Sequence, residues 1–258
     1  MVSKPKIRLY VESELADGAG VTLTPPQSHY ISHVMRCSEG QKVLVFNGRQ
    51  GEWLASVGSI HKKHTGLDIL QQLRTQTTSP DMCLVFAPVK NKTEVIIEKA
   101  VELGVRRIMP VLTQYTVVRS LNEERLQARI IEAAEQCGRL DLPVLQPLQE
   151  LRSLLGAWDN DHPLLFADER GHGHPLKDIL AADNTAIPAL LVGPEGGFSE
   201  EEHTLLHKQP FIKPVSLGPR ILRADTAAIS ALACLMAWQG DWQEQPCYPQ
   251  LAAGSHTT

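Results

Sequence analysis

The residues best suited to chemistry lie in two glycine- and proline-rich loops near the C-terminus. Residues 192–198 read VGPEGGF, and residues 217–223 read LGPRILR. Glycine has no Cβ, so its backbone can pass close to a ligand, and proline restricts the residue before it. Because each loop follows a short apolar run, we expect both to leave the ends of buried strands, where open α/β sheets bind ligands. The spacing therefore predicts one site built from both loops.

Four charged side chains in or beside these loops could act on a ligand. Arg220 and Arg223 offer forked donors that suit a phosphate or a carboxylate. Glu195 lies in a loop that we expect to be closely packed, so its carboxylate needs hydrogen bonds or a raised pKa. Asp225 precedes a helical run and is expected to cap it. Each side chain could instead serve the fold alone, with an arginine paired to an acidic neighbour.

The familiar phosphate, metal and nucleophile motifs do not fit. The first loop is neither GxGxxG nor a P-loop, because no Gly-Lys-Ser/Thr follows it. The closest histidine pairs, His61 with His64 and His172 with His174, lack a third ligand at a convincing spacing, so no metal is expected. There is no GxSxG motif, and no cysteine stands near a histidine in the pattern of a nucleophile.

The elements that must position the loops fall into two regions. Residues 1–75 contain short, partly alternating apolar runs, with a helix expected near residues 29–35, and this pattern predicts a small β-barrel. The runs lie at residues 7–11, 42–46, 52–57 and 66–70. A polar stretch ending at Pro80 reads as a linker. In residues 76–258 strands alternate with helices, which predicts an α/β domain with a mostly parallel sheet covered on both faces.

The second region contains clear start and stop signals. Expected strands lie at residues 82–88, 107–112, 143–146, 164–167, 189–192 and 215–217, and expected helices at 92–103, 122–138 and 226–238. Ser199 and Glu202 form a capping box, so a helix should begin directly after the first loop. The last helix is apolar almost all round, which is typical of a helix buried in the core or at a subunit interface.

Composition sets broad limits on function. A chain of 258 residues, 43% of them hydrophobic, can bury one large core or two modest ones. The net charge of −4 does not indicate a general nucleic-acid-binding surface, but residues 1–80 carry nine Lys and Arg against six Asp and Glu. That excess favours contact of this part with a polyanion, or arises by chance. Scattered cysteines, no apolar leader and no long apolar run predict a cytoplasmic protein without a membrane partner.

The motifs resemble those of the bacterial 16S ribosomal RNA uridine-N3 methyltransferases of the RsmE type. Besides the two loops, the resemblance rests on EKAVELGV at 98–105, EQCGR at 135–139 and HVMR at 33–36, and it covers about residues 8–241. It implies a SPOUT-class methyltransferase domain with a trefoil knot over residues 76–258 and a PUA-like RNA-binding β-barrel over residues 1–75. It also implies S-adenosylmethionine as methyl donor, a homodimer, and 16S rRNA of the small ribosomal subunit or its precursor as partner.

Carried over by position, the resemblance assigns roles to individual residues. Expected cofactor-binding residues are Phe166, Asp168, Val192, Gly193, Glu195, Gly196, Gly197, Leu217, Gly218, Ile221, Leu222 and Arg223. Arg223 is the first electrostatic candidate for catalysis and Arg220 the second, with Glu195 or Asp225 as proton acceptor. Phosphate contacts are expected from Lys4, Lys6, Arg8, Arg36, Arg49, Lys62 and Lys63, each of which could equally be an ordinary surface charge.

Two departures from the family pattern and two alternatives stay open. The family often shows Thr-Glu-Thr-Ala after the last arginine, whereas residues 224–227 are ADTA. Residues 114–116 are QYT where the family has Ser-Glu-Arg, so contacts of that stretch are not transferred. The chain could be another SPOUT methyltransferase acting on transfer RNA or on ribose. It could also be a non-catalytic RNA-binding assembly factor.

Overall fold

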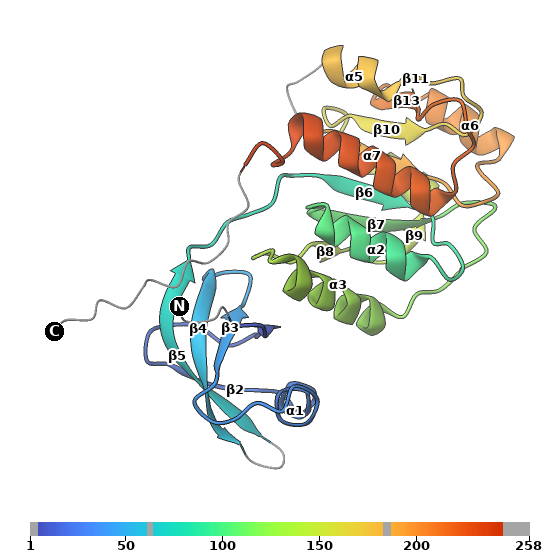
Figure 1. The fold of residues 1–258 in the computed structure, drawn as a ribbon. Helices are drawn as coiled ribbons and strands as arrows, with labels where there is room; N and C mark the ends of the chain where they lie inside the picture. The colour runs from blue at the N-terminus through green and yellow to red at the C-terminus, as the bar shows by residue number, and fades with distance from the viewer. Residues whose placement is uncertain (1–4, 61–63, 183–186, 245–258) are drawn as a thin grey trace. The chain divides into compact units, whose positions relative to one another are not determined.

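The computed structural model describes residues 5–60, 64–182 and 187–244, which form two compact units (Figure 1). The N-terminal unit contains residues up to Thr78 together with residues 135–141, and the second unit contains the rest of the described chain. Lys4, Lys62 and Lys63, three of the expected phosphate contacts, lie outside the described residues.

The N-terminal unit is a curled five-stranded sheet around an apolar core (Figure 1). Its elements are β1 (Arg8–Tyr10), β2 (Gly20–Thr22), α1 (Pro25–His29), a wide π-helical turn η1 (Tyr30–Val34), β3 (Lys42–Phe46), β4 (Glu52–Ile60) and β5 (Thr65–Arg74). The strand order is β1-β3-β4-β5-β2, and only β1 and β3 pair in parallel. Alternating apolar residues of these strands fill the interior.

The helix of this unit begins four residues earlier than its apolar pattern predicts. Thr24 caps it, because the threonine hydroxyl accepts from the N–H of Gln27 and the Gln27 side chain accepts from the N–H of Thr24. Pro25 and Pro26 occupy the first turn, where a missing N–H costs little. A capping box with proline is thus the start signal here.

Residues 135–141 pack with the N-terminal sheet, although sequence reasoning placed them in the second domain. The N–H of Tyr10 donates to Glu135 Oε1 at 2.8 Å, and Arg74 Nη1 donates to the carbonyl of Gly138 at 2.9 Å. Arg8 Nη2 donates to the carbonyl of Arg139 at 2.7 Å. These contacts join residues that lie far apart in the sequence, so no local sequence pattern predicts them.

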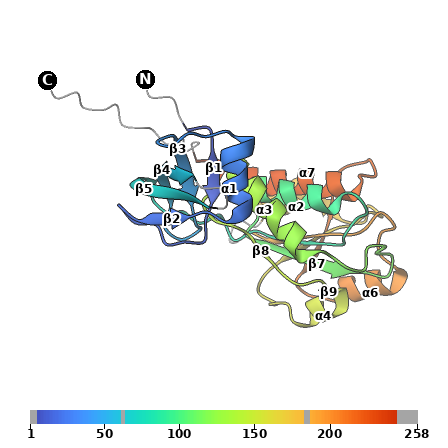
Figure 2. The ribbon, with the colours of Figure 1, turned by 90° about the horizontal axis from the view of Figure 1, so that it is seen from below.

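The second unit is a parallel sheet with helices on both faces. The strand order is β11 (His174–Pro175), β13 (Ile212–Ser216), β10 (Leu164–Ala167), β12 (Ala189–Val192), β6 (Cys83–Phe86), β7 (Arg107–Leu112) and β8 (Val144–Leu145), with β9 (Gln149–Glu150) pairing to β7. The helices are α2 (Thr93–Glu102), α3 (Glu123–Cys137), α4 (Leu151–Gly156), α5 (Leu176–Ala182), α6 (Glu200–His207) and α7 (Ala224–Gln239). Figure 2 shows α2, α3 and α7 on one face and α4 and α6 on the other. The parallel sheet expected from the strand–helix alternation is confirmed.

The path of the chain brings three loops to one edge of this sheet. Strand β10 lies between β13 and β12, and all three run parallel, so the loops that follow them leave at the same edge. Strand β13 lies on the far side of β10 from β12, yet the helix that follows it, α7, packs on β12 and α2. The chain therefore crosses back over β10 between β13 and α7. Helix α6 starts at the predicted capping box of Ser199 and Glu202, which places the first glycine loop between β12 and α6.

Candidate functional site

A pocket of about 800 Å³ lies where the three loops meet. Its walls are residues 167–171 after β10, 192–197 after β12 and 215–224 after β13, with Ala227 of α7. A volume of this size is in the range of small-molecule and cofactor sites. The two glycine–proline loops thus share one pocket as predicted, and a third loop that sequence reasoning barely used completes it.

Of the expected cofactor-binding residues, only Phe166 does not line the pocket. The Phe166 side chain is fully buried, and its ring packs edge-on against that of Phe198, with 5.1 Å between centroids. Successive side chains of a strand point to opposite faces, so Ala167 reaches the pocket while Phe166 enters the core. The expectation for Phe166 was therefore wrong.

Asp168 shapes the loop that carries it. Its carboxylate is buried, and it accepts from the N–H of Arg170 at 2.9 Å and from the N–H of His172 at 3.2 Å. Both oxygens are therefore engaged by the backbone of their own loop. Asp168 lines the pocket mainly as the residue that holds this loop in shape.

Glu169 and Arg170 are pocket residues that sequence reasoning missed. Arg170 forms two hydrogen bonds to the exposed carboxylate of Glu200, at 3.0 and 2.7 Å. Glu169 Oε1 accepts from the N–H of Phe198 and lies 3.0 Å from His203 Nε2. The available signal was the charged run DER directly after the buried strand 164–167.

The space next to the Gly218 main chain is unoccupied by other atoms of the described protein. Its φ of +108° is a conformation that side-chain-bearing residues rarely adopt, and a Cβ built there would meet nothing within 4 Å. This part of the wall leaves room for a ligand to approach the main chain. Close by, Ile221 is 92% exposed, which is unusual for an isoleucine and gives the open wall an apolar surface.

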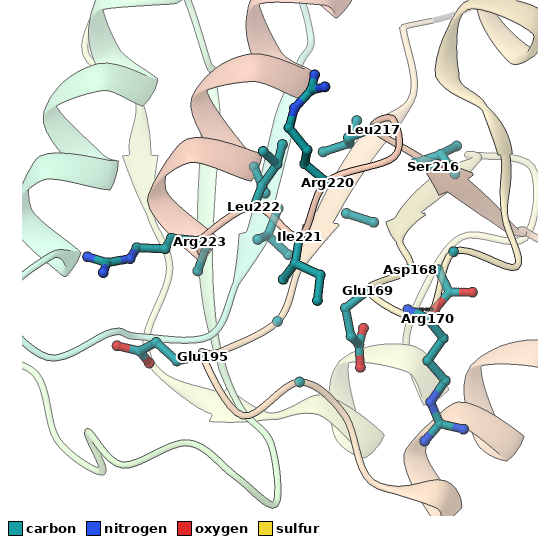
Figure 3. A pocket seen from close by; sticks show the side chains of 18 of the residues that line it. Asp168, Glu169, Arg170, Glu195, Ser216, Leu217, Arg220, Ile221, Leu222 and Arg223 are labelled. Atoms are coloured by element: carbon teal, nitrogen blue, oxygen red, sulfur yellow. Dashed lines mark hydrogen bonds between the residues drawn. The ribbon is translucent and has the colours of Figure 1, made fainter.

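The two loop arginines differ from Arg170 in their ion pairing. Among the residues that the structure describes, neither Arg220 nor Arg223 has an ion-pair partner, unlike Arg170. In Figure 3 Arg223 extends to the same side of the view as Glu195, while Arg220 extends another way. Glu195 is exposed, so the expectation that close packing constrains its carboxylate was wrong.

Asp225 neither caps α7 nor lines the pocket. The helix begins at Ala224, and Arg223 is the N-cap residue, whose side chain makes no capping hydrogen bond. Asp225 lies in the first turn, 3.1 Å from Lys92 Nζ. Burial alone would raise the pKa of Asp225, but hydrogen bonds from Lys92 and the N–H of Thr226, with the charge of Lys92, lower it below the ordinary aspartate value. A carboxylate held ionised in this way is a poor proton acceptor.

We expect Asp225→Asn to lower the free energy of unfolding at pH 7 by about 0.5–1 kcal/mol, since the Lys92 end of the pair is half exposed and screened. A lowered pKa contributes stability above the ordinary aspartate pKa, and that contribution is lost as the pH falls through the lowered value. The difference from wild type should therefore vanish in acid. Urea unfolding from pH 3 to 8 measures it. Asp178→Asn, in the first turn of α5, is the control, and an equal loss there would contradict the role of Lys92.

The expected phosphate contacts of the N-terminal unit divide into three groups. Lys6 and Arg36 are exposed, and Arg49 is half exposed and 3.0 Å from Glu14. Arg8 is different, because its side chain is 9% exposed and its Nε donates to Glu52 Oε1 at 2.6 Å. Arg8 is held inside the unit by this ion pair, which disfavours the phosphate contact expected for it.

Comparison with known proteins agrees with this geometry. A family model described as an RNA methyltransferase domain matches residues 77–236, and one described as an RNA methyltransferase PUA domain matches residues 23–65. Ribosomal RNA small subunit methyltransferase E of Rickettsia conorii is 34% identical over 230 residues, covering 88% of this chain and 93% of its own. The same enzyme of Synechocystis is 35% identical over 246 residues, 89% of this chain and 77% of its own.

Solved structures agree as well. The Neisseria gonorrhoeae methyltransferase E bound to S-adenosylmethionine superposes with a TM-score of 0.82 at 28% identity, covering 92% of this chain and 99% of that one. A Legionella pneumophila protein solved with the same cofactor gives a TM-score of 0.82 at 32% identity, covering 93% and 100%. The fold and the three-loop site define a SPOUT-class RNA methyltransferase domain that follows a PUA-like domain in the sequence. The chain belongs to the ribosomal RNA small subunit methyltransferase E family.

Membrane-spanning character is absent from the described helices. None of those within residues 5–60, 64–182 and 187–244 combines the length and apolarity that crossing a bilayer requires.

Proposed function

We propose that this protein transfers the methyl group of S-adenosylmethionine to N3 of a uridine in 16S ribosomal RNA. The observation that carries the proposal is the pocket formed by the loops after β10, β12 and β13, whose lining includes Arg220 and Arg223, two arginines with no ion-pair partner among the described residues. Family membership and the two related structures solved with S-adenosylmethionine support the cofactor and the class of RNA.

The residues present fit S-adenosylmethionine. Leu217, Ile221 and Leu222 give an apolar wall for an adenine ring, and the open backbone at Gly218 gives main-chain polar groups within reach of it. The loop at residues 192–197 supplies the opposite wall. When bound, the cofactor supplies an electrophilic methyl group on its sulfonium.

The chain's own residues must then prepare the uracil. Uridine N3 carries a proton at neutral pH, so its reaction needs a proton acceptor and stabilisation of the negative charge that spreads to the neighbouring carbonyl oxygens. Arg223, which has no counter-ion in the described chain, is placed to supply the positive charge. The exposed carboxylate of Glu195 is the remaining acceptor candidate, because Asp225 is committed to Lys92.

The RNA must present an unpaired base. N3 lies on the pairing edge of uracil, so a paired uridine has to be extruded before reaction. Exposed Lys6 and Arg36 of the N-terminal unit are proposed to contact phosphates in ribosomal RNA, in the cytoplasmic small subunit or its precursor.

The test compares ribosomal RNA from a strain lacking this protein with that of its parent by nucleoside mass spectrometry. We expect N3-methyluridine to be absent from 16S rRNA of the deletion strain and restored by the wild-type gene. An unchanged N3-methyluridine level would refute the assignment, and loss of a different nucleoside would favour a transfer RNA or ribose methyltransferase. Calorimetric titration with S-adenosylmethionine separates enzymes from a non-catalytic assembly factor, which would not bind it.

We also propose a homodimer that pairs through α7. The helix buries one side in the core but exposes Cys234 and Trp238, one turn apart, with Trp238 53% exposed. Exposed apolar surface on one helical face is typical of interfaces. We expect a dimeric mass for the wild type in light scattering and a monomeric mass for Trp238→Asp. The exposed polar Gln243→Asp provides the control. A monomeric wild type at micromolar concentration would contradict the dimer.

A further inference from the structure

We propose that Glu169 is a positioning residue, whose carboxylate holds the loop between β12 and α6 in the shape that binds the methyl donor. This inference rests on the proposed function, because it assigns a role within the same pocket. Glu169 belongs to the loop after β10, and so it links two of the three pocket walls.

One carboxylate oxygen makes this link. Glu169 Oε1 accepts from the N–H of Phe198 at 3.0 Å and lies 3.0 Å from His203 Nε2. A carboxylate oxygen accepts, so this contact is satisfied by the His203 tautomer that donates through Nε2. His203 is 4% exposed, and its ring packs at a tilt against Phe166 and edge-on against Phe198 in the core, which holds the imidazole in place.

The backbone of the loop is adapted to this carboxylate. Gly197 has a φ of +67°, and a Cβ there would lie 2.4 Å from Glu169 Oε1. A side chain at position 197 would therefore have to displace the Glu169 carboxylate, and the positive φ also favours glycine there. Phe198 follows at once and anchors the loop by packing edge-on against Phe166. Figure 3 shows Glu169 between the second glycine loop and the backbone of the first.

Hydrogen bonding accounts for this acidic cluster better than a metal does. Ligand atoms of Asp168, Glu169 and His203 lie within 4.8 Å of one another, an arrangement that could hold an ion. However, both oxygens of Asp168 accept from backbone N–H groups, and Glu169 Oε1 accepts from Phe198. These donors occupy the positions that a cation would need.

The test measures S-adenosylmethionine binding by calorimetry and methyl transfer to small-subunit RNA for Glu169→Ala and Glu169→Gln. Losing two hydrogen bonds to a charged acceptor should raise the Kd and KM for S-adenosylmethionine about tenfold or more in Glu169→Ala. At saturating cofactor kcat should stay near wild type, because the reacting groups are untouched. Glu169→Gln keeps an acceptor oxygen for Phe198 and should recover most of the affinity. The rate of hydrogen exchange at the Phe198 amide should rise in Glu169→Ala but not in Glu169→Gln.

Glu201→Gln removes a charge from the first turn of the neighbouring helix, outside this pocket, and should bind like wild type. A Kd for S-adenosylmethionine in Glu169→Ala equal to that of wild type would overturn the proposal. Equal losses of affinity in the alanine and glutamine variants would also overturn it, because they would mean that Glu169 contacts the ligand directly. If Glu169→Ala fails to fold, His203→Gln tests the same link and should show a smaller rise in Kd. A wild-type protein that does not bind S-adenosylmethionine refutes the proposed function instead.

Discussion

Replacing Arg223 with alanine is expected to lower kcat for methyl transfer by roughly 10²–10³-fold, the usual cost of removing one preorganised donor from a site of developing charge. The Kd for S-adenosylmethionine should change little, because the loop at residues 217–223 is proposed to contact the cofactor through its apolar side chains and the main chain at Gly218, and not through the Arg223 guanidinium. The loss therefore appears in kcat, because the negative charge of the deprotonated uracil needs a nearby cation.

The measurement is single-turnover transfer of labelled methyl groups to small-subunit RNA from a strain lacking this protein. Arg223→Lys should recover part of kcat, since it restores the charge without the planar fork of donors. Arg220→Ala is the internal comparison, because this side chain extends another way in the same loop, and we expect a smaller loss there. A kcat for Arg223→Ala within threefold of wild type would rule out the electrostatic role.

Replacing Arg8 with methionine is expected to destabilise the protein by about 3 kcal/mol, the lower end of the cost of leaving a buried charge without its partner. Glu52 is 1% exposed, and within the described residues its Oε2 has no hydrogen-bond partner. Its Oε1 accepts from Arg8 at 2.6 Å, and Arg74 Nη1 lies farther away at 3.8 Å, so Arg8 is the main partner of this carboxylate. The Arg8 guanidinium also lies over the ring of Phe46, 3.7 Å from its centroid. Methionine keeps much of the packing volume, so the loss reports mainly on charge.

Urea unfolding of the full chain, followed by circular dichroism, measures this loss. The double variant Arg8→Met/Glu52→Gln should recover part of the stability, because a neutral amide costs less to bury than a carboxylate. Lys6→Met, two residues away and exposed, should unfold like wild type while weakening binding to RNA. If Arg8→Met unfolds like wild type but binds RNA weakly, Arg8 is a phosphate contact after all.

The elements around the pocket could be predicted because their signals are local. The strands at residues 107–112, 164–167 and 189–192 have the predicted bounds, since a buried parallel strand shows as an uninterrupted apolar run between turn residues. The capping box of Ser199 and Glu202 also depends on residues only three apart. The short helices α4 and α5 carry too few residues for a periodic pattern and were not predicted.

The sequence by itself determined that two glycine–proline loops follow buried strands, that they form one site, and that an apolar helix closes the domain. Only the tertiary structure decided which charges serve that site. Glu169 meets His203 across 34 positions, and Arg8 meets Glu52 across 44 and the carbonyl of Arg139 across 131. Backbone propensity and hydrophobic periodicity act over a few residues. Whether a carboxylate or a guanidinium is free for a ligand depends on which distant groups the fold brings within hydrogen-bond distance.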